Sequence, residues 1–118
     1  MSLAAQSRPV DMDHLARYTG GDAALNAEVL QLFAGQSAEL VARLHSVLDA
    51  RNAREWKEIT HSLKGAARGI GAFAFADAAA RAEPLEAVPD NLVAIQALQS
   101  LRHEAEIVQR FIEAYLGR

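Results

Sequence analysis

The chain has 118 residues, a formal net charge of -3 and no cysteine. Its length suits one compact domain, and its acidic balance disfavours a general nucleic-acid binder, which is usually basic. Without cysteine, disulfides, thiolate zinc sites and cysteine nucleophiles are excluded. The N-terminus lacks a signal segment, and no apolar run approaches the ~18 residues that a membrane helix needs. We therefore expect a cytoplasmic protein that binds neither nucleic acid nor a membrane.

The first half of the chain predicts a tail and two helices. Residues 1–9 are expected to form a flexible tail, and residues 10–118 a single domain. A short helix over 10–18 ends at Gly20 and Gly21, and Asp22 is the predicted N-cap of a long helix over 23–50. Steps of three and four along that helix predict one apolar row: Leu25, Val29, Leu32, Phe33, Gln36, Leu40, Leu44 and Val47.

Three more helices are predicted in the second half. The helix over 53–70 has a predicted buried row of Trp56, Ile59, Leu63, Ala66 and Ile70. The helix over 72–87 is predicted to bury Phe73, Ala76, Ala79 and Ala80, but Pro84 should end or kink it near Ala82 or Glu83, because proline breaks a helix interior. The helix over 91–116 has the most regular row: Ala94, Leu98, Leu101, Ala105, Val108, Ile112 and Tyr115.

The short links between these helices make consecutive helices antiparallel neighbours. The predicted fold class is all-α, an up-and-down antiparallel four-helix bundle with a short extra N-terminal helix. Such bundles host many functions, so the function has to be argued from a site.

His61 is the strongest candidate for that site. It is predicted in the middle of a helix, on a face turned to water. Lys57 lies one turn before it, Lys64 and Gly65 one turn after it, and Arg68 two turns after it. This basic patch suits an anion or an acidic partner. Gly65 costs roughly 1 kcal/mol relative to alanine in an exposed helix interior, and its advantage would be clearance for a partner. Spacing alone also fits an ordinary solvated helix face.

Other chemistry is poorly represented in the sequence. His14, His45 and His103 lack the spacing of a bundle metal site, so we expect no metal and no bound cofactor. There is no Walker A phosphate-binding loop, and Gly69-Ile70-Gly71 is better interpreted as a helix end.

The run His61-Ser62-Leu63-Lys64-Gly65-Ala66, followed by Gly71, resembles the signature of the histidine phosphotransfer (HPt) domain family. The likeness extends to Tyr18-Thr19-Gly20-Gly21-Asp22 before a long helix and to Glu83–Glu86, and it covers residues 10–116. The resemblance implies that His61 accepts a phosphoryl group through Nε2, that Lys64 neutralises it and that Gly65 admits the partner. Arg68 and Gly69 are less typical of the family.

The resemblance also implies the partners. A receiver-domain aspartate would give the phosphoryl group to His61, and a second receiver domain would take it, with Mg²⁺ bound by the receiver. The chain would be a monomeric phosphocarrier without kinase activity of its own. Lys57, Arg68, Leu30 and Leu15 are the predicted partner-binding residues, the two leucines because they are expected to be exposed.

Two alternatives stay open at this point. One is a helical adaptor that binds a receiver domain or another partner without phosphotransfer. The other is a domain cut from a larger hybrid kinase, although Met1 and the tail favour a free-standing protein.

Overall fold

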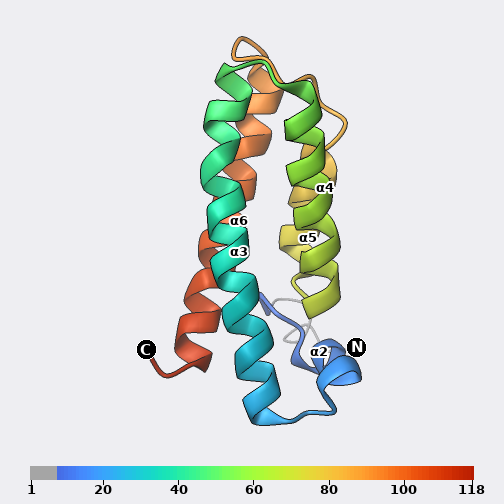
Figure 1. Ribbon diagram of the computed structural model, residues 1–118, viewed down its shortest axis with the longest axis vertical. Helices are drawn as coiled ribbons and strands as arrows, with labels where there is room; N and C mark the ends of the chain where they lie inside the picture. Colours follow the sequence, from blue (N-terminus) through green and yellow to red (C-terminus); the bar gives the residue numbers. More distant parts are fainter. Residues whose placement is uncertain (1–7) are drawn as a thin grey trace.

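A computed structural model describes residues 8–118 as five helices. These are α2 (Met12–Thr19), α3 (Ala23–Asp49), α4 (Ala53–Ile70), α5 (Phe73–Ala82) and α6 (Leu92–Tyr115). Helices α3 to α6 run up and down beside one another, and α2 lies at one end of the bundle (Figure 1). The predicted four-helix bundle with a short extra N-terminal helix is confirmed. The predicted flexible tail, 1–9, lies mostly outside the described residues.

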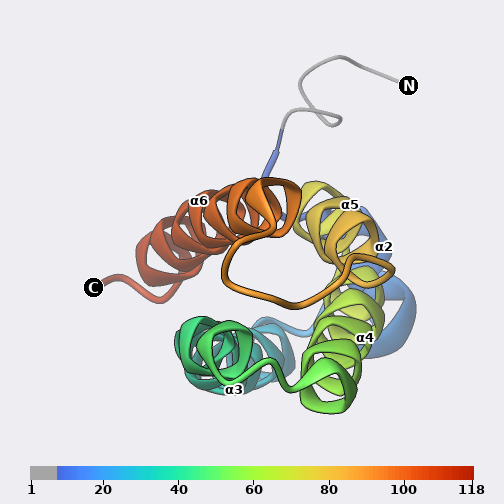
Figure 2. The same ribbon diagram turned by 90° about the horizontal axis from the view of Figure 1, so that it is seen from above.

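The four long helices close a ring around one core. Each of them packs against two others, α3 on α4 and α6, and α5 on α4 and α6 (Figure 2). The predicted row of α6 is buried from Ala94 to Ile112, whereas Tyr115 at its end is 38% exposed. Trp56, Ile59 and Leu63 of α4 are buried as predicted, but Ala66 is exposed and its neighbour Ala67 is buried.

The predicted apolar row of α3 is wrong in part. Leu25 and Leu32 are 40% and 65% exposed. Polar residues occupy two of the buried positions: Asn26 is contacted by the hydroxyl of Thr19 at 2.5 Å, and Ser37 receives a contact of 3.4 Å from the amide of Gln109. Hydropathy cannot identify such positions, so the predicted row is rotated around the helix. The buried residues of α3 are Asn26, Leu30, Phe33, Ser37, Val41, Leu44, Val47 and Leu48.

Helix α5 is shorter than the predicted helix over 72–87. It ends at Ala82, two residues before Pro84, so the predicted early end is confirmed. Phe73, predicted to pack inward, is 43% exposed, and Phe75 is fully buried in its place. The indole Nε1 of Trp56 donates a hydrogen bond of 2.9 Å to the carbonyl oxygen of Ala82 and so fixes the end of α5 against α4.

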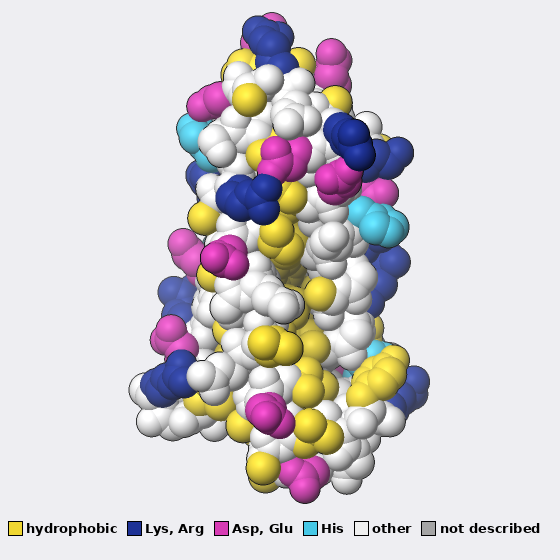
Figure 3. All heavy atoms as spheres, in the orientation of Figure 1, with side chains coloured by type: hydrophobic (Ala, Val, Ile, Leu, Met, Phe, Trp, Pro, Cys, Tyr) yellow, Lys and Arg dark blue, Asp and Glu magenta, His cyan; other side chains and the backbone are white. Residues whose placement is uncertain are grey.

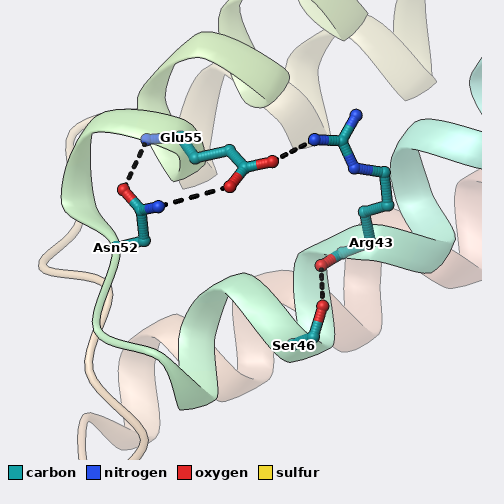
Figure 4. Close-up of polar contacts among 4 residues, drawn as sticks. All are labelled: Arg43, Ser46, Asn52 and Glu55. Carbon is teal, nitrogen blue, oxygen red and sulfur yellow. Dashed lines mark hydrogen bonds and ion pairs between the residues drawn. The ribbon is translucent and has the colours of Figure 1, made fainter.

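Side-chain contacts fix the start of α4, the helix that carries His61. Asn52 is its N-cap and accepts a hydrogen bond of 3.1 Å from the backbone N–H of Glu55. In return, the Asn52 amide donates to the Glu55 carboxylate at 3.3 Å, an arrangement like a capping box. Arg43 of α3 pairs with the same carboxylate, and the Ser46 hydroxyl donates to the Arg43 carbonyl (Figure 4).

The other end of α4 is fixed by a backbone contact. The N–H of Asp11 donates a hydrogen bond of 2.9 Å to the carbonyl oxygen of Gly71. Gly71 has φ 86°, a left-handed conformation that favours glycine. This contact joins the start of α2 to the turn between α4 and α5.

Candidate functional site

His61 lies in the middle of α4 with 68% of its side chain exposed. Its backbone is held by buried neighbours on the opposite face of the helix: Leu63 is 1% exposed, and Thr60 is completely buried. The Thr60 hydroxyl donates a hydrogen bond of 2.8 Å to the carbonyl oxygen of Trp56, one turn earlier. The imidazole is therefore presented to solvent from a well-anchored helix, as the sequence predicted.

A carboxylate that the sequence analysis did not assign to the site lies behind the imidazole. Oε1 of Glu83 is 3.4 Å from Nδ1 of His61 and 2.8 Å from Nζ of Lys64. The carboxylate is mostly enclosed, with 17% of the Glu83 side chain exposed. Within the described residues, Oε1 has no partner with the full geometry of a hydrogen bond. Both contacts are therefore ion-pair contacts, and this oxygen remains able to accept a hydrogen bond.

The fold explains how Glu83 reaches His61. Each residue lies about three helical turns from the Gly71–Ala72 turn: His61 precedes it on α4, and Glu83 follows it as the C-cap residue directly after α5. Because α4 and α5 are antiparallel neighbours, the two residues arrive at the same level. Pro84 follows Glu83 directly and prevents α5 from continuing. The number of residues between the turn and each of these two positions was the sequence feature that could have placed Glu83 beside His61. It can be used only when the position of the turn is known.

The electrostatics of the site depend on Lys64. The close contact of its ammonium lowers the pKa of the Glu83 carboxyl below the ordinary value, and His61 adds to this effect; partial burial of the carboxyl opposes it. In turn, Glu83 balances the charge of Lys64. The site is thus a carboxylate in contact with both a histidine and a lysine, and not the purely basic patch that the sequence predicted.

Gly65 has open space around it. A Cβ at this position would meet nothing within 4 Å among the described residues. The glycine is exposed and has no unusual backbone conformation. Within the described part of the chain, then, no packing contact requires a glycine here, and position 65, one turn after His61, presents no side chain.

The four predicted partner-binding residues divide into two pairs. Lys57 and Arg68 are exposed on α4 one turn before and two turns after His61, and they form no ion pair with any described residue. Leu15 and Leu30 are buried, with 1% and 0% exposure, so the prediction that they line an exposed docking surface is wrong. Both leucines are core residues. Leu30 belongs to the buried row of α3, whereas the hydropathy pattern predicted a row on a different side of that helix.

Residues 8–118 contain no group of three or more histidine, aspartate or glutamate side chains arranged to hold a metal ion. None of the described helices combines the length and the apolar character of a membrane span.

Comparison with known proteins identifies the family. The family model described as "Hpt domain" matches residues 28–113, from the first turns of α3 almost to the end of α6. No curated protein and no solved structure gave a significant match. The match therefore covers all of α4, which carries His61, all of α5 and most of α3 and α6.

Proposed function

Because the chain belongs to the histidine phosphotransfer (Hpt) domain family, we propose that His61 is the residue on which it carries a phosphoryl group. Hpt domains act in phosphorelay signalling, where a histidine receives and passes on this group. One observation carries the assignment: His61 is an exposed imidazole whose Nδ1 faces the Glu83 carboxylate, with Lys64 bound to the same oxygen. His14, His45 and His103 have no such surroundings in the described structure.

In the proposed reaction, the lone pair of His61 Nε2 attacks the phosphorus of an aspartyl phosphate on a receiver domain. An N–P bond forms, the bond from phosphorus to the aspartate oxygen breaks, and the carboxylate leaves with the electron pair. Nδ1 keeps its proton, so the ring becomes positively charged. The Glu83 carboxylate, 3.4 Å away, offsets this charge and selects the tautomer in which Nε2 is free. Glu83 is thus proposed as a positioning residue.

Lys64 has a different proposed role. Its Nζ is held 2.8 Å from Glu83 before any phosphoryl group arrives, and only 21% of its side chain is exposed. The ammonium is a compact charge on a flexible stem, so it can turn from the carboxylate to a phosphoryl oxygen over a short path. The contact with Glu83 therefore holds a positive charge ready beside His61, where the new negative charge will appear.

The second step of the proposed cycle is the reverse reaction with another receiver. An aspartate oxygen attacks phosphorus, the N–P bond breaks, and its electron pair returns to Nε2. Phosphoryl transfer requires in-line placement and charge neutralisation, and the receiver would bring the aspartate and the Mg²⁺. We propose that this chain is a phosphocarrier between receivers and has no ATP-dependent activity of its own.

The exposed residues of α4 complete the proposal. Gly65 would let the receiver approach the imidazole closely, since no described residue lies within 4 Å of a Cβ built on it. Lys57 and Arg68 would attract the carboxylates around the phosphorylated aspartate. These two cations flank His61 along the helix, so the attraction would be centred on the imidazole.

Transfer from a panel of receiver domains, each phosphorylated with labelled phosphate, tests the proposal. We expect at least one receiver to give the chain an acid-labile label, and His61→Gln to remove it while leaving the helical circular dichroism spectrum unchanged. Label retained in His61→Gln would exclude His61 as the acceptor. A receiver that binds the parent chain without transferring phosphate would instead favour the adaptor function.

A further inference from the structure

The chain has only two lysines, and both lie one helical turn from His61. Ten of its twelve basic residues are arginine, whereas Lys57 stands four positions before His61 and Lys64 three positions after it. Residues three and four apart are neighbours on the surface of a helix. The lysine amine is a nucleophile when it is neutral, and the arginine guanidinium stays protonated. All the side-chain amines of this chain therefore lie beside one imidazole.

The two lysines have different surroundings. Nζ of Lys64 is 2.8 Å from the Glu83 carboxylate, and 21% of this side chain is exposed. Lys57 is exposed and forms no ion pair with any described residue. Of the two lysines, Lys57 is the one that lines a shallow hollow next to the imidazole. This hollow has a volume of about 460 Å³ and is lined by Arg54, Lys57, Glu58, His61 and Glu83.

The carboxylates of this hollow are engaged with other groups. Glu58 pairs with Arg54 at 3.0 Å, and Oε1 of Glu83 contacts Lys64 and Nδ1 of His61. Acidic, basic and histidine side chains also gather along the α4 side of the molecule (Figure 3). Because the nearby carboxylates already have partners, the amine of Lys57 is able to turn toward the imidazole.

An imidazole and an amine one turn apart are suited to acyl transfer. Nucleophilic catalysis by histidine divides one difficult step into two easier ones, and a second nucleophile in the same molecule acts at a high effective concentration. The aspartyl phosphate that is proposed to react with His61 is itself an acyl phosphate. Its phosphorus and its carbonyl carbon are both electrophilic. A small acyl phosphate offers the same two centres to Nε2 of His61.

We infer that Lys57 is a self-acylation site, to which His61 passes an acyl group taken from a small acyl phosphate. In the first step, the lone pair of Nε2 attacks the carbonyl carbon, an N–C bond forms, and phosphate leaves with the electron pair of the C–O bond. In the second step, the neutral amine of Lys57 attacks the same carbon. The bond from this carbon to Nε2 breaks, its electron pair returns to the ring, and the amine proton goes to water. The products are an amide on Lys57 and inorganic phosphate.

Acylation would change the charge beside the imidazole. The amide of an acylated Lys57 is neutral, so one of the two free cations that flank His61 along α4 is lost. This consequence rests on the proposed function, because it requires that a receiver approaches His61. We expect the acylated chain to take phosphate from a receiver about threefold more slowly or worse. Its rate with phosphoramidate, a small phosphodonor that needs no docking surface, should stay at the parental value.

Reaction with p-nitrophenyl acetate tests acyl transfer with a probe that contains no phosphorus. Release of nitrophenolate measures attack on the ester, and peptide mass spectrometry locates the stable acetyl group. We expect acetylation of the parent chain to be faster at Lys57 than at Lys64, and His61→Gln to slow it at Lys57 about tenfold or more. His103→Gln is the matched control and should leave the rate unchanged, since His103 is exposed on α6 and has no lysine within four positions. Acetyl phosphate should give the same amide.

Several results would overturn this inference. Equal acetylation of Lys57 in the parent chain and in His61→Gln would show ordinary lysine reactivity. Faster acetylation of Lys64 would contradict the selection of Lys57, and an amide from the ester but none from acetyl phosphate would exclude the acyl phosphate as donor. Equal transfer from a receiver before and after acylation would remove its effect on docking. Failure of the proposed function gives a different result: the parent chain takes label from no receiver and none from phosphoramidate, whatever the ester reaction shows.

Discussion

Trp56 and Ala82, 26 residues apart in sequence, are joined by a buried hydrogen bond of 2.9 Å from the indole Nε1 to the carbonyl oxygen. Trp56 is 1% exposed and Ala82 is completely buried. The bond adds a second donor to a carbonyl at the end of α5, which also accepts a hydrogen bond of 3.2 Å from the backbone N–H of Leu85. It also fixes Ala82, the residue directly before Glu83. The same buried hydrogen bond therefore stabilises the core and helps to position Glu83 in the candidate site.

Trp56→Phe is expected to destabilise the fold. It keeps a large ring but removes one of the two hydrogen bonds that the Ala82 carbonyl accepts, and a lost hydrogen bond costs about 0.5–1.5 kcal/mol. Urea unfolding followed by circular dichroism measures this loss. A change below about 0.5 kcal/mol would mean that water replaces the indole as donor. Because Ala82 precedes Glu83, the variant should also accept phosphate from phosphoramidate more slowly than the parent chain.

Glu83→Gln is expected to change the acid dependence of stability. The lowered pKa of Glu83 means that its ionised form is favoured by folding. Its stabilisation is therefore full above the unfolded-state pKa, about 4.3, and is lost as the pH falls from there through the lower folded-state value. Denaturant unfolding from pH 7 to pH 3 should show a smaller acid-induced loss for Glu83→Gln than for the parent chain. Parallel curves would contradict the contact with Lys64.

Two substitutions of Glu83 distinguish its proposed effect on the orientation of the His61 ring from the effect of its negative charge. Glu83→Gln retains an amide oxygen that can accept a hydrogen bond from Nδ1 of His61, whereas Glu83→Ala removes both the charge and the acceptor. If orientation dominates, Glu83→Ala should accept phosphate from phosphoramidate about tenfold more slowly and Glu83→Gln almost normally. If charge dominates, both variants should be slow. Parental rates in both variants would remove Glu83 from the mechanism.

The sequence predicted the bundle well, and its errors have physical causes. The row of α6 was predicted correctly because apolar residues fill every inward position from Ala94 to Ile112. The row of α3 was partly wrong because Asn26 and Ser37 are buried polar residues with polar partners from α2 and α6. Leu30 was therefore assigned to the surface, although it is a fully buried member of the row.

The sequence predicted only those residues of the candidate site that lie on one helix, α4. His61, Lys64 and Gly65 follow from spacing within α4 and from the family signature. Glu83 comes from another helix, and its contact depends on where α4 turns and where α5 ends. Phe73 was expected inside the core and is 43% exposed, because hydropathy does not distinguish an exposed ring from a buried one.

Gly71→Ala is expected to destabilise the turn that aligns Glu83 with His61. A Cβ at Gly71 would lie 2.7 Å from the backbone oxygen of Asp11, and the left-handed φ of 86° adds about 1–2 kcal/mol for a residue with a side chain. Because the clashing atom belongs to the backbone, α2 must move. We expect a loss of at least 2 kcal/mol in urea unfolding. A loss below 1 kcal/mol would show that α2 is only loosely attached.

Gly65 and Gly35 form a matched pair for the last prediction. Both are exposed glycines inside helices, and neither has an atom within 4 Å of a Cβ position. Glutamine is a better helix former than glycine, so Gly65→Gln and Gly35→Gln should each stabilise the chain by roughly 0.5 kcal/mol. Only Gly65 lies one turn from His61. Transfer from a phosphorylated receiver should therefore fall about tenfold or more in Gly65→Gln and stay at the parental rate in Gly35→Gln.

The Gly65 and Gly35 variants also distinguish an effect on the approach of the partner from an effect on the stability of the fold. A stabilised Gly65→Gln that transfers slowly would mean that the glycine lowers the stability of the chain and serves the approach of the partner. Phosphoramidate needs far less space than a receiver domain, so its reaction with His61 should be much less affected by the glutamine. Equal slowing with both donors would place the obstruction at the imidazole itself, and unchanged transfer would leave Gly65 without a role in docking.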